Sequence, residues 1–166
     1  IESDGHPRTA PDGGRAMTGI AEALALARVH RDGRAWLVIT HPATLPSDPT
    51  SAFADAAGQG RILLWHGDEW RLGIGVTQEL RADGPGRHMS AASAVAALRA
   101  TCVVVGEAAG HLPCLLHVLA FAERPAGGAW GDLPGSRVIL PRRLLIRQAD
   151  GRGWSITAVA VHAEYN

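Results

Sequence analysis

A strand, tight turn and strand pattern occurs twice in this chain of 166 residues, and it restricts the fold more than any other feature. In each copy, a Gly-Asp or Asp-Gly dipeptide separates two runs of alternating apolar residues, a pattern typical of a β-hairpin. The predicted strands are residues 61–66 and 69–80 around the turn at 67–68, and residues 136–147 and 153–162 around the turn at 150–151. The two hairpins together predict an antiparallel sheet.

Alternation within residues 69–80 assigns side chains to the two faces of the predicted sheet. The apolar face carries Trp70, Leu72, Ile74 and Val76. Gly73 and Gly75 fall on the opposite face. A glycine inside a strand often marks close approach by another part of the chain, so we expect something to pack tightly against this backbone.

The remaining elements complete an α+β prediction. Residues 35–40 form a strand, and residues 112–122, the most apolar run, form a strand expected at the centre of a sheet. The predicted helices are residues 18–31 capped by Thr18, a short one from Asp48-Pro49 to Gly58, and residues 89–101 with Met89, Ala92, Val95 and Leu98 on the apolar face. The fold class is therefore α+β, a mainly antiparallel sheet covered by about three helices.

Composition favours one globular domain. The hydrophobic fraction is 46% and the charged fraction 19%, which is far from a disordered composition. We expect a single α+β domain over residues 17–166, preceded by a flexible amino-terminal segment, residues 1–16. No window reaches the ~18 apolar residues of a membrane span, so no membrane span is expected.

Charge and cysteine content narrow the partners and the compartment. The net charge is zero, which gives no electrostatic reason to expect nucleic-acid binding. The two cysteines, Cys102 and Cys114, form no CxxC pair and predict reduced thiols in the cytoplasm. All 16 basic residues are arginine, so this chain supplies no lysine as a general base or Schiff-base nucleophile.

Two segments carry a resemblance to a known enzyme family. The first, ILLWHGDEWRLGIGVTQELRADGP at residues 62–85, has an apolar strand, a turn, and a second strand containing Leu-Gly-Ile-Gly before a polar loop. The second begins at Leu119 and continues through GAWGDLPGSRVILPRRLLIR, where a Trp-containing loop precedes an apolar strand reading Leu-Pro-Arg. Their order, spacing and intervening Ala-rich helix resemble the amino-terminal half of isochorismate synthase, in the chorismate-utilising enzyme family, over residues 18–163.

This resemblance implies a scaffold, because the family's chemistry lies in its carboxy-terminal half. It implies the first half of the chorismate-utilising fold and a part in converting chorismate to isochorismate, for menaquinone or siderophore biosynthesis. The complete enzyme uses Mg²⁺, a lysine base and a glutamate acid. The resemblance therefore places no catalytic, cofactor-binding or metal-ligating residue on this chain, which alone is expected to be inactive. The implied partner is the catalytic half, in the same or a separate chain.

One strand departs from the family pattern and motivates an alternative. Where the family has Gly-Gly-Phe-Ala-Phe-Asp, residues 117–122 read His-Val-Leu-Ala-Phe-Ala. Glycines allow close backbone approach, whereas His117 and Val118 would crowd it. The alternative is a non-catalytic subunit or interaction module derived from this fold, with a protein partner in an assembly.

Three further groups have chemistry that suits a binding site. His111, Cys114 and His117, with Cys102 nearby, are zinc-ligand types. Alternation along a strand turns Cys114 and His117 to opposite faces, which favours a buried thiol and a hydrogen-bonded histidine instead.

Arginines near the second hairpin form another group. Arg142, Arg143 and Arg147 have the fork geometry that binds carboxylates. In a continuous strand, however, Arg142 faces away from the other two, and solvated strand ends are the favoured interpretation. Trp130, in a glycine-rich loop, is the third candidate and is expected to lie at an interface.

Overall fold

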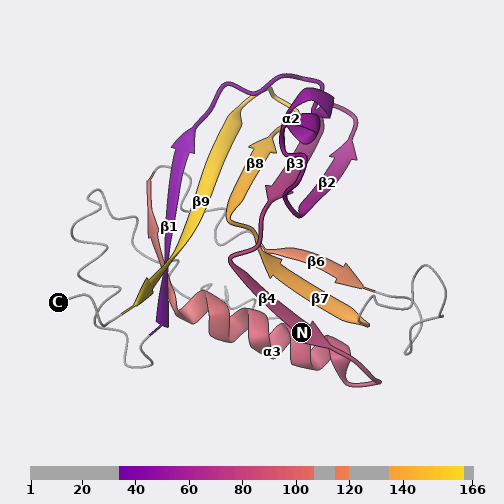
Figure 1. Ribbon diagram of the computed structural model, residues 1–166, viewed down its shortest axis with the longest axis vertical. Coiled ribbons are helices and arrows are strands. Elements are labelled where there is room, and N and C mark those ends of the chain that lie inside the picture. The colour runs from indigo at the N-terminus through magenta and orange to yellow at the C-terminus, as the bar shows by residue number, and fades with distance from the viewer. Residues whose placement is uncertain (1–33, 107–114, 120–134, 163–166) are drawn as a thin grey trace, which may run out of the picture.

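The computed structural model of the chain describes residues 34–106, 115–119 and 135–162 (Figure 1). The described elements are β1 (Arg34–Pro42), α2 (Thr50–Asp55), β2 (Arg61–His66), β3 (Glu69–Ile74), β4 (Gln78–Ala82), α3 (Arg87–Ala100), β5 (Cys102–Val105), β6 (Leu116–Leu119), β7 (Ser136–Leu140), β8 (Arg143–Arg147) and β9 (Gly153–His162). Neither of the described helices is long and apolar enough to cross a membrane.

The strands form two sheets, which Figure 1 shows as an upper and a lower group. The larger sheet has six strands in the order β2-β3-β8-β9-β1-β5, and the smaller has three in the order β4-β7-β6. Pairs between the described strands are antiparallel except for β1 with β5, which is parallel. The hairpins β2–β3 and β8–β9 confirm both hairpins expected from the sequence. The fold is α+β and mainly antiparallel, as predicted.

The long strands predicted over residues 69–80 and 136–147 are wrong as continuous elements, because each one changes sheet partway along. The first divides into β3 and β4, and the second into β7 and β8. Since β3 pairs with β8 and β4 pairs with β7, one bent ladder joins the two sheets. At the bend, residues 75–77 stand opposite residues 141–142, so one side carries an extra residue. Such a β-bulge bends a strand and increases its twist.

Gly75 and Pro141 explain why the bend lies at this position. Gly75 has a φ of 66°, a conformation that costs glycine little. Pro141 has no N–H to contribute to the ladder. The two segments of the ladder stay hydrogen-bonded across the bend. The Thr77 N–H donates to the Leu140 carbonyl at 2.9 Å, and the Arg142 N–H donates to the Gly75 carbonyl at 3.4 Å.

The main core lies between one face of the larger sheet, here the inner face, and the smaller sheet together with α3. Alternation along each strand sends its apolar side chains to this face. The buried residues of this core are Trp36, Val38, Leu98, Leu116, Ile139, Leu140, Leu144, Ile146, Ile156 and Ala158. It follows that the smaller sheet is held by its packing as well as by the bent ladder.

The opposite face of the larger sheet, here the outer face, carries two further buried clusters. One consists of Trp70, Leu72 and Leu145, with Ala52 and Phe53 of α2 packed against them. The other consists of Ala35, Leu37, Val103 and Val105, on β1 and β5. The larger sheet is therefore apolar on both faces.

The expected start of α2, with Asp48 as the cap and Pro49 as the first helical residue, is wrong by one position, because Pro49 is the N-cap and has no side-chain cap hydrogen bond. The Asp48 carboxylate accepts the Thr50 N–H at 2.9 Å and the Thr50 hydroxyl at 2.8 Å, which satisfies groups left open at a helix start. The helix itself begins at Thr50, after Pro49, and ends at Asp55. It is shorter than the predicted helix that reached Gly58.

Predicted side-chain positions were partly right. Gly73 is closely approached as expected, since a Cβ there would collide with Leu116 Cδ1 and lie 3.4 Å from Pro141 Cβ. Val76 is wrong as a member of the Trp70 face, because the bulge displaces it and leaves it 37% exposed. Met89 is also wrong as a core residue, with 74% exposure.

Two expectations about elements also need correction. The strand predicted over residues 112–122 appears as β6, which pairs with β7 alone within the described residues and so forms an edge instead of a centre. The described part of the chain contains two helices rather than about three. The helix predicted over residues 18–31 and the flexible segment predicted over residues 1–16 lie outside the described residues.

Candidate functional site

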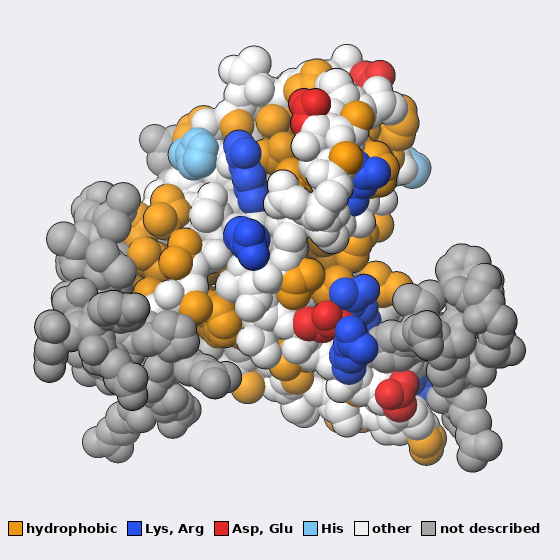
Figure 2. Space-filling model, viewed as in Figure 1, with side chains coloured by type: hydrophobic (Ala, Val, Ile, Leu, Met, Phe, Trp, Pro, Cys, Tyr) orange, Lys and Arg blue, Asp and Glu red, His pale blue; other side chains and the backbone are white. Residues whose placement is uncertain are grey.

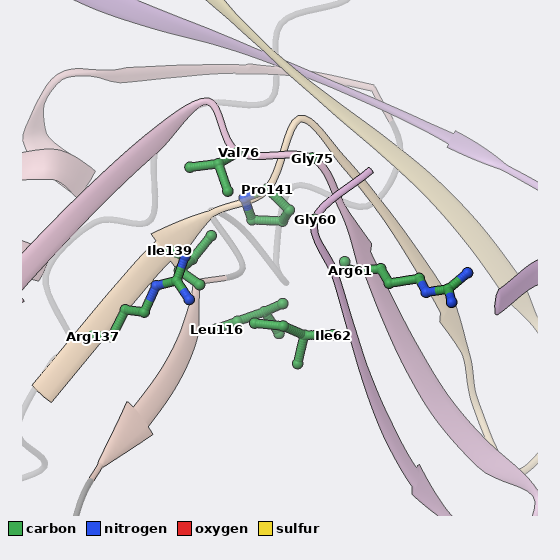
Figure 3. Close-up of a pocket in the computed structure, with 10 residues that line it drawn as sticks. Gly60, Arg61, Ile62, Gly75, Val76, Leu116, Arg137, Ile139 and Pro141 are labelled. Carbon is green, nitrogen blue, oxygen red and sulfur yellow. The ribbon is translucent and has the colours of Figure 1, made fainter. Parts of the chain in front are cut away.

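A hollow of about 180 Å³ lies at the bend, in the angle between the two sheets (Figure 3). Its walls come from four separate parts of the chain, namely residues 60–62, 73–76, 116 and 137–141. Figure 3 shows Val76, Gly75 and Pro141 at the bend, with Leu116 and Ile139 on one side and Ile62 on the other. The bend in the ladder that joins the two sheets therefore also forms one wall of this hollow.

The lining of the bend hollow is mostly apolar. Ile62 of β2, Leu116 of β6 and Ile139 of β7 face one another across it. Gly73 lets the two sheets approach here, because its missing side chain leaves the space that Leu116 occupies. Such a lining suits an apolar group better than a charged one.

Arg137 is one of two charged residues on the walls of this hollow. Its Nε lies 2.7 Å from Glu79 Oε1, and its Nη2 donates to Glu79 Oε2 at 3.1 Å. Arg81 Nε donates to Glu79 Oε1 at 2.5 Å. The hydrogen bond from Arg81, with that from Arg137, holds the pKa of Glu79 below its usual range against the opposing effect of burial. Glu79 therefore stays ionised at neutral pH and cannot serve as a general acid.

Arg61 belongs to the same hollow by position but points away from it (Figure 3). Its Nη1 donates to the Phe53 carbonyl at 2.5 Å, and its guanidinium lies 4.1 Å from the centre of the Phe53 ring. Arg61 thus ties β2 to α2. Among the described residues that line the bend hollow, none is a free acid, a base or an activated nucleophile.

The three arginines near the second hairpin separate into two places. Arg147 reaches the turn between β2 and β3, where its Nη1 donates to the Asp68 carbonyl at 2.5 Å. Arg142 and Arg143 line one hollow together on the outer face. The expectation that Arg142 faces away from Arg143 is wrong, because Arg142 precedes β8 at the bend and does not follow the alternation of the strand.

The structure does not assemble the zinc ligands among the residues that it describes. His117 Nε2 lies 2.8 Å from the hydroxyl of Ser136, a hydrogen bond between β6 and β7. Cys102 packs beside the main core on β5. Within residues 34–106, 115–119 and 135–162, no three His, Cys, Asp or Glu side chains come together as a metal site. His111, Cys114 and the interface candidate Trp130 lie outside these residues.

Cys102 is expected to react slowly with thiol reagents. Burial raises the pKa of this thiol to about 11, against a smaller opposing effect of Arg99, and the thiolate is the reactive form. Iodoacetamide labelling at pH 8, followed by peptide mass spectrometry that separates Cys102 from Cys114, should show strong protection that urea removes. Because the folded pKa is raised, this group also lowers stability as pH rises from about 9 to about 11. Rapid labelling of Cys102 in the folded protein would contradict the packing of β5.

Comparison of the chain with protein-family models, curated proteins and solved structures finds no match in any of the three. The assignment of a function therefore depends on the residues and geometry described above.

Proposed function

We propose that this chain is the amino-terminal scaffold of an isochorismate synthase-like enzyme, which packs against a catalytic half in the same or a separate chain. The observation that supports it is an open angle between the two sheets, here the wedge, bounded by β2 above and β6 below. Figure 1 shows both strands on the same side of the molecule. Within the described residues, β2 pairs with β3 alone and β6 with β7 alone, so each presents an unpaired edge.

Exposed apolar side chains lie on these two edge strands. Leu64 and Trp65 of β2 are 51% and 53% exposed, and Val118 of β6 is 40% exposed. Figure 2 shows apolar surface at the waist between the upper and lower parts of the molecule. Natural proteins usually protect an edge strand with Lys, Pro or a bulge. The sequence of β2, RILLWH, has none of these between residues 62 and 65, which suits a strand that is covered by another segment.

The chemistry of the bend hollow agrees with a scaffold role. Of the two arginines on its walls, Arg137 is paired with Glu79 and Arg61 points away to Phe53, and the remaining described walls are apolar or glycine. Under the proposal, Mg²⁺ and the acid and base for chorismate belong to the catalytic half. The enzyme would work in the cytoplasm, where a free thiol such as Cys102 stays reduced.

The test is reconstitution of activity from the two halves. The chain is mixed with the Mg²⁺-dependent chorismate-utilising segment encoded in the same or a neighbouring gene, and isochorismate is measured by chromatography. The chain alone should give no isochorismate from chorismate and Mg²⁺, whereas the mixture should. Turnover by the chain alone, or full activity of the catalytic half without it, would overturn the proposal.

Substitution of the β2 edge sharpens this test. The variant Leu64→Glu should raise the concentration of chain needed for half-maximal activity by about tenfold or more, because Leu64 lies on the same face of β2 as Ile62, which borders the wedge. Met89→Glu is the matched control, since Met89 is 74% exposed on α3, away from the wedge. Equal effects of the two variants would place the interface elsewhere.

A non-catalytic interaction module is the second candidate. It is favoured by β6, where His117 and Val118 replace the glycines of the family pattern and the exposed Val118 faces away from the α3 side. A stoichiometric partner that lacks the Mg²⁺-dependent chorismate-utilising sequence, measured by native mass spectrometry, would support this candidate over the first.

A further inference from the structure

A second hollow, of about 420 Å³, lies on the outer face of the larger sheet between α2 and the strands β8 and β9. Arg142 and Arg143 both line it. Figure 2 shows basic side chains over β8 and β9 on this face, with acidic side chains farther up near α2. This arginine hollow is separate from the wedge, which opens on the inner side of the bend.

The two arginines are held in position by different parts of the fold. Arg142 lies over Gly75, where a Cβ would stand 3.3 Å from Arg142 Cβ and 3.8 Å from its guanidinium carbon. The absent side chain of Gly75 thus leaves room for this guanidinium. Arg143 donates from Nε to the hydroxyl of Ser155 at 3.3 Å, and Ser155 is 1% exposed. This bond uses one of the five N–H donors of Arg143 and leaves the others for a ligand.

Neither arginine is neutralised by an acidic side chain within the described residues. The ion pairs there use Arg71, Arg81, Arg137 and Arg152. Asp55 is the acidic residue on the wall of the arginine hollow, but it lies beyond ion-pair distance of both guanidinium groups. Two adjacent positive charges without carboxylate partners create a preference for an anion.

The rest of the arginine hollow combines apolar walls with two neutral polar groups. The apolar walls are Ala52 and Ala56 on the α2 side and Ile74 and Leu145 on the sheet side. The two neutral polar groups are Gln59 and Thr157, and Thr157 stands directly opposite Arg143 in the ladder between β8 and β9. An apolar cleft with a few convergent polar groups is the usual form of a small-molecule site.

We propose that the arginine hollow binds a small organic carboxylate, with its carboxylate on Arg142 and Arg143 and its apolar body against Ile74 and Leu145. Arginine matches the planar two-oxygen geometry of a carboxylate through paired N–H donors. The apolar walls distinguish this ligand from inorganic phosphate, which would use the charges alone. The site uses the outer face, so the proposal does not depend on the scaffold function.

The test uses benzoate as the probe, with benzamide and inorganic phosphate as comparisons, in NMR or calorimetric titrations of the full chain. Benzoate should bind saturably, and at least about tenfold more tightly than neutral benzamide of the same shape. Arg142→Gln and Arg143→Gln should each weaken benzoate binding by about tenfold. Arg143→Lys should weaken it less than Arg143→Gln, because it keeps the charge while losing the fork geometry.

Arg152→Gln is the matched control, because Arg152 is an exposed arginine that pairs with Asp150 in the turn beyond β8. It should leave benzoate binding unchanged. Thermal unfolding of each variant checks that the fold is intact, and Arg142 and Arg143 are exposed enough to be replaced without loss of the core. Three outcomes would each overturn the proposal. They are benzamide binding as tightly as benzoate, phosphate binding where benzoate does not bind, and benzoate affinity that is unchanged in both arginine variants.

Discussion

Replacement of Trp70 with alanine should lower the free energy of unfolding by about 3–5 kcal/mol, one of the two largest effects expected from a single substitution in this chain. Trp70 is 1% exposed and packs with Leu72 and Leu145 beneath α2. Its Nε1 also donates to the Pro46 carbonyl at 3.1 Å. The substitution would leave a cavity under α2 and would remove the bond that holds the segment leading into this helix.

Trp65→Ala is the matched control for Trp70→Ala. Trp65 is the cross-strand partner of Trp70, and it also donates from Nε1 to a carbonyl, that of Gly67 at 2.9 Å. It is 53% exposed, so its loss should cost less than about 1 kcal/mol. The two tryptophans thus have the same side chain and the same kind of hydrogen bond but differ in burial.

Urea unfolding followed by circular dichroism measures both variants. A large drop in the midpoint for Trp70→Ala beside a small one for Trp65→Ala is the expected result. Trp70→Phe keeps most of the apolar volume and removes the bond to Pro46, so its cost should lie well below that of Trp70→Ala and close to the roughly 1 kcal/mol of a hydrogen bond plus a small cavity. Similar midpoints for Trp70→Ala and Trp65→Ala would show that the outer face is not packed as described.

The hairpins could be predicted from the sequence because their information is local. Each turn has a Gly-Asp or Asp-Gly pair, and alternation on either side sets which face is buried. The start of α2 could be predicted to within one residue for the same reason, since the Asp48 carboxylate accepts a hydrogen bond from Thr50, two residues along the chain. Where the local geometry depends on a few neighbouring residues, the structure agrees with the prediction from the sequence pattern.

The bend could not be predicted from alternation, because apolar residues continue in step on both sides of it. Pro141 was a visible signal, since proline is unsuited to an inner strand, and Gly75 was another. The pattern does not show that Gly75 and Pro141, 66 residues apart in sequence, lie on the two sides of the same bend. Only the register of the whole ladder brings them together.

Both hollows were missed for this reason. The bend hollow needs residues from β2, β3, β6 and β7, and the pairing of Arg137 with Glu79 spans 58 positions. Arg142, Arg143 and Arg147 were recognised as carboxylate-binding types, but strand alternation grouped Arg143 with Arg147. At the bend, however, Arg142 and Arg143 line one hollow together, while Arg147 reaches the turn between β2 and β3. The sequence shows that these residues are arginines. Which of them lie side by side depends on the extra residue at the bend.

Replacement of Gly106 with alanine should destabilise the protein by roughly 2–5 kcal/mol, through two separate causes. Gly106 follows β5 with a φ of 111°, where an L side chain is strained. A Cβ there would also collide with the backbone carbonyl of Thr40 and lie 2.6 Å from its hydroxyl oxygen. Thr40 is 4% exposed on β1, which pairs on both sides, with β5 and β9. The carbonyl therefore cannot move without disturbing the ladder that connects three strands.

Gly58→Ala reports the first cause alone, because Gly58 also has a positive φ and no atom lies near its missing side chain. Its φ is 81° and nothing lies within 4 Å of a Cβ built on it, so its replacement should cost only the conformational strain, about 1–2 kcal/mol. The excess for Gly106→Ala over Gly58→Ala, measured by urea unfolding, then reports the contact with Thr40. Equal losses would mean that the end of β5 does not pass against β1. The parallel pair of β1 and β5, which the sequence pattern did not predict, would then need to be placed differently.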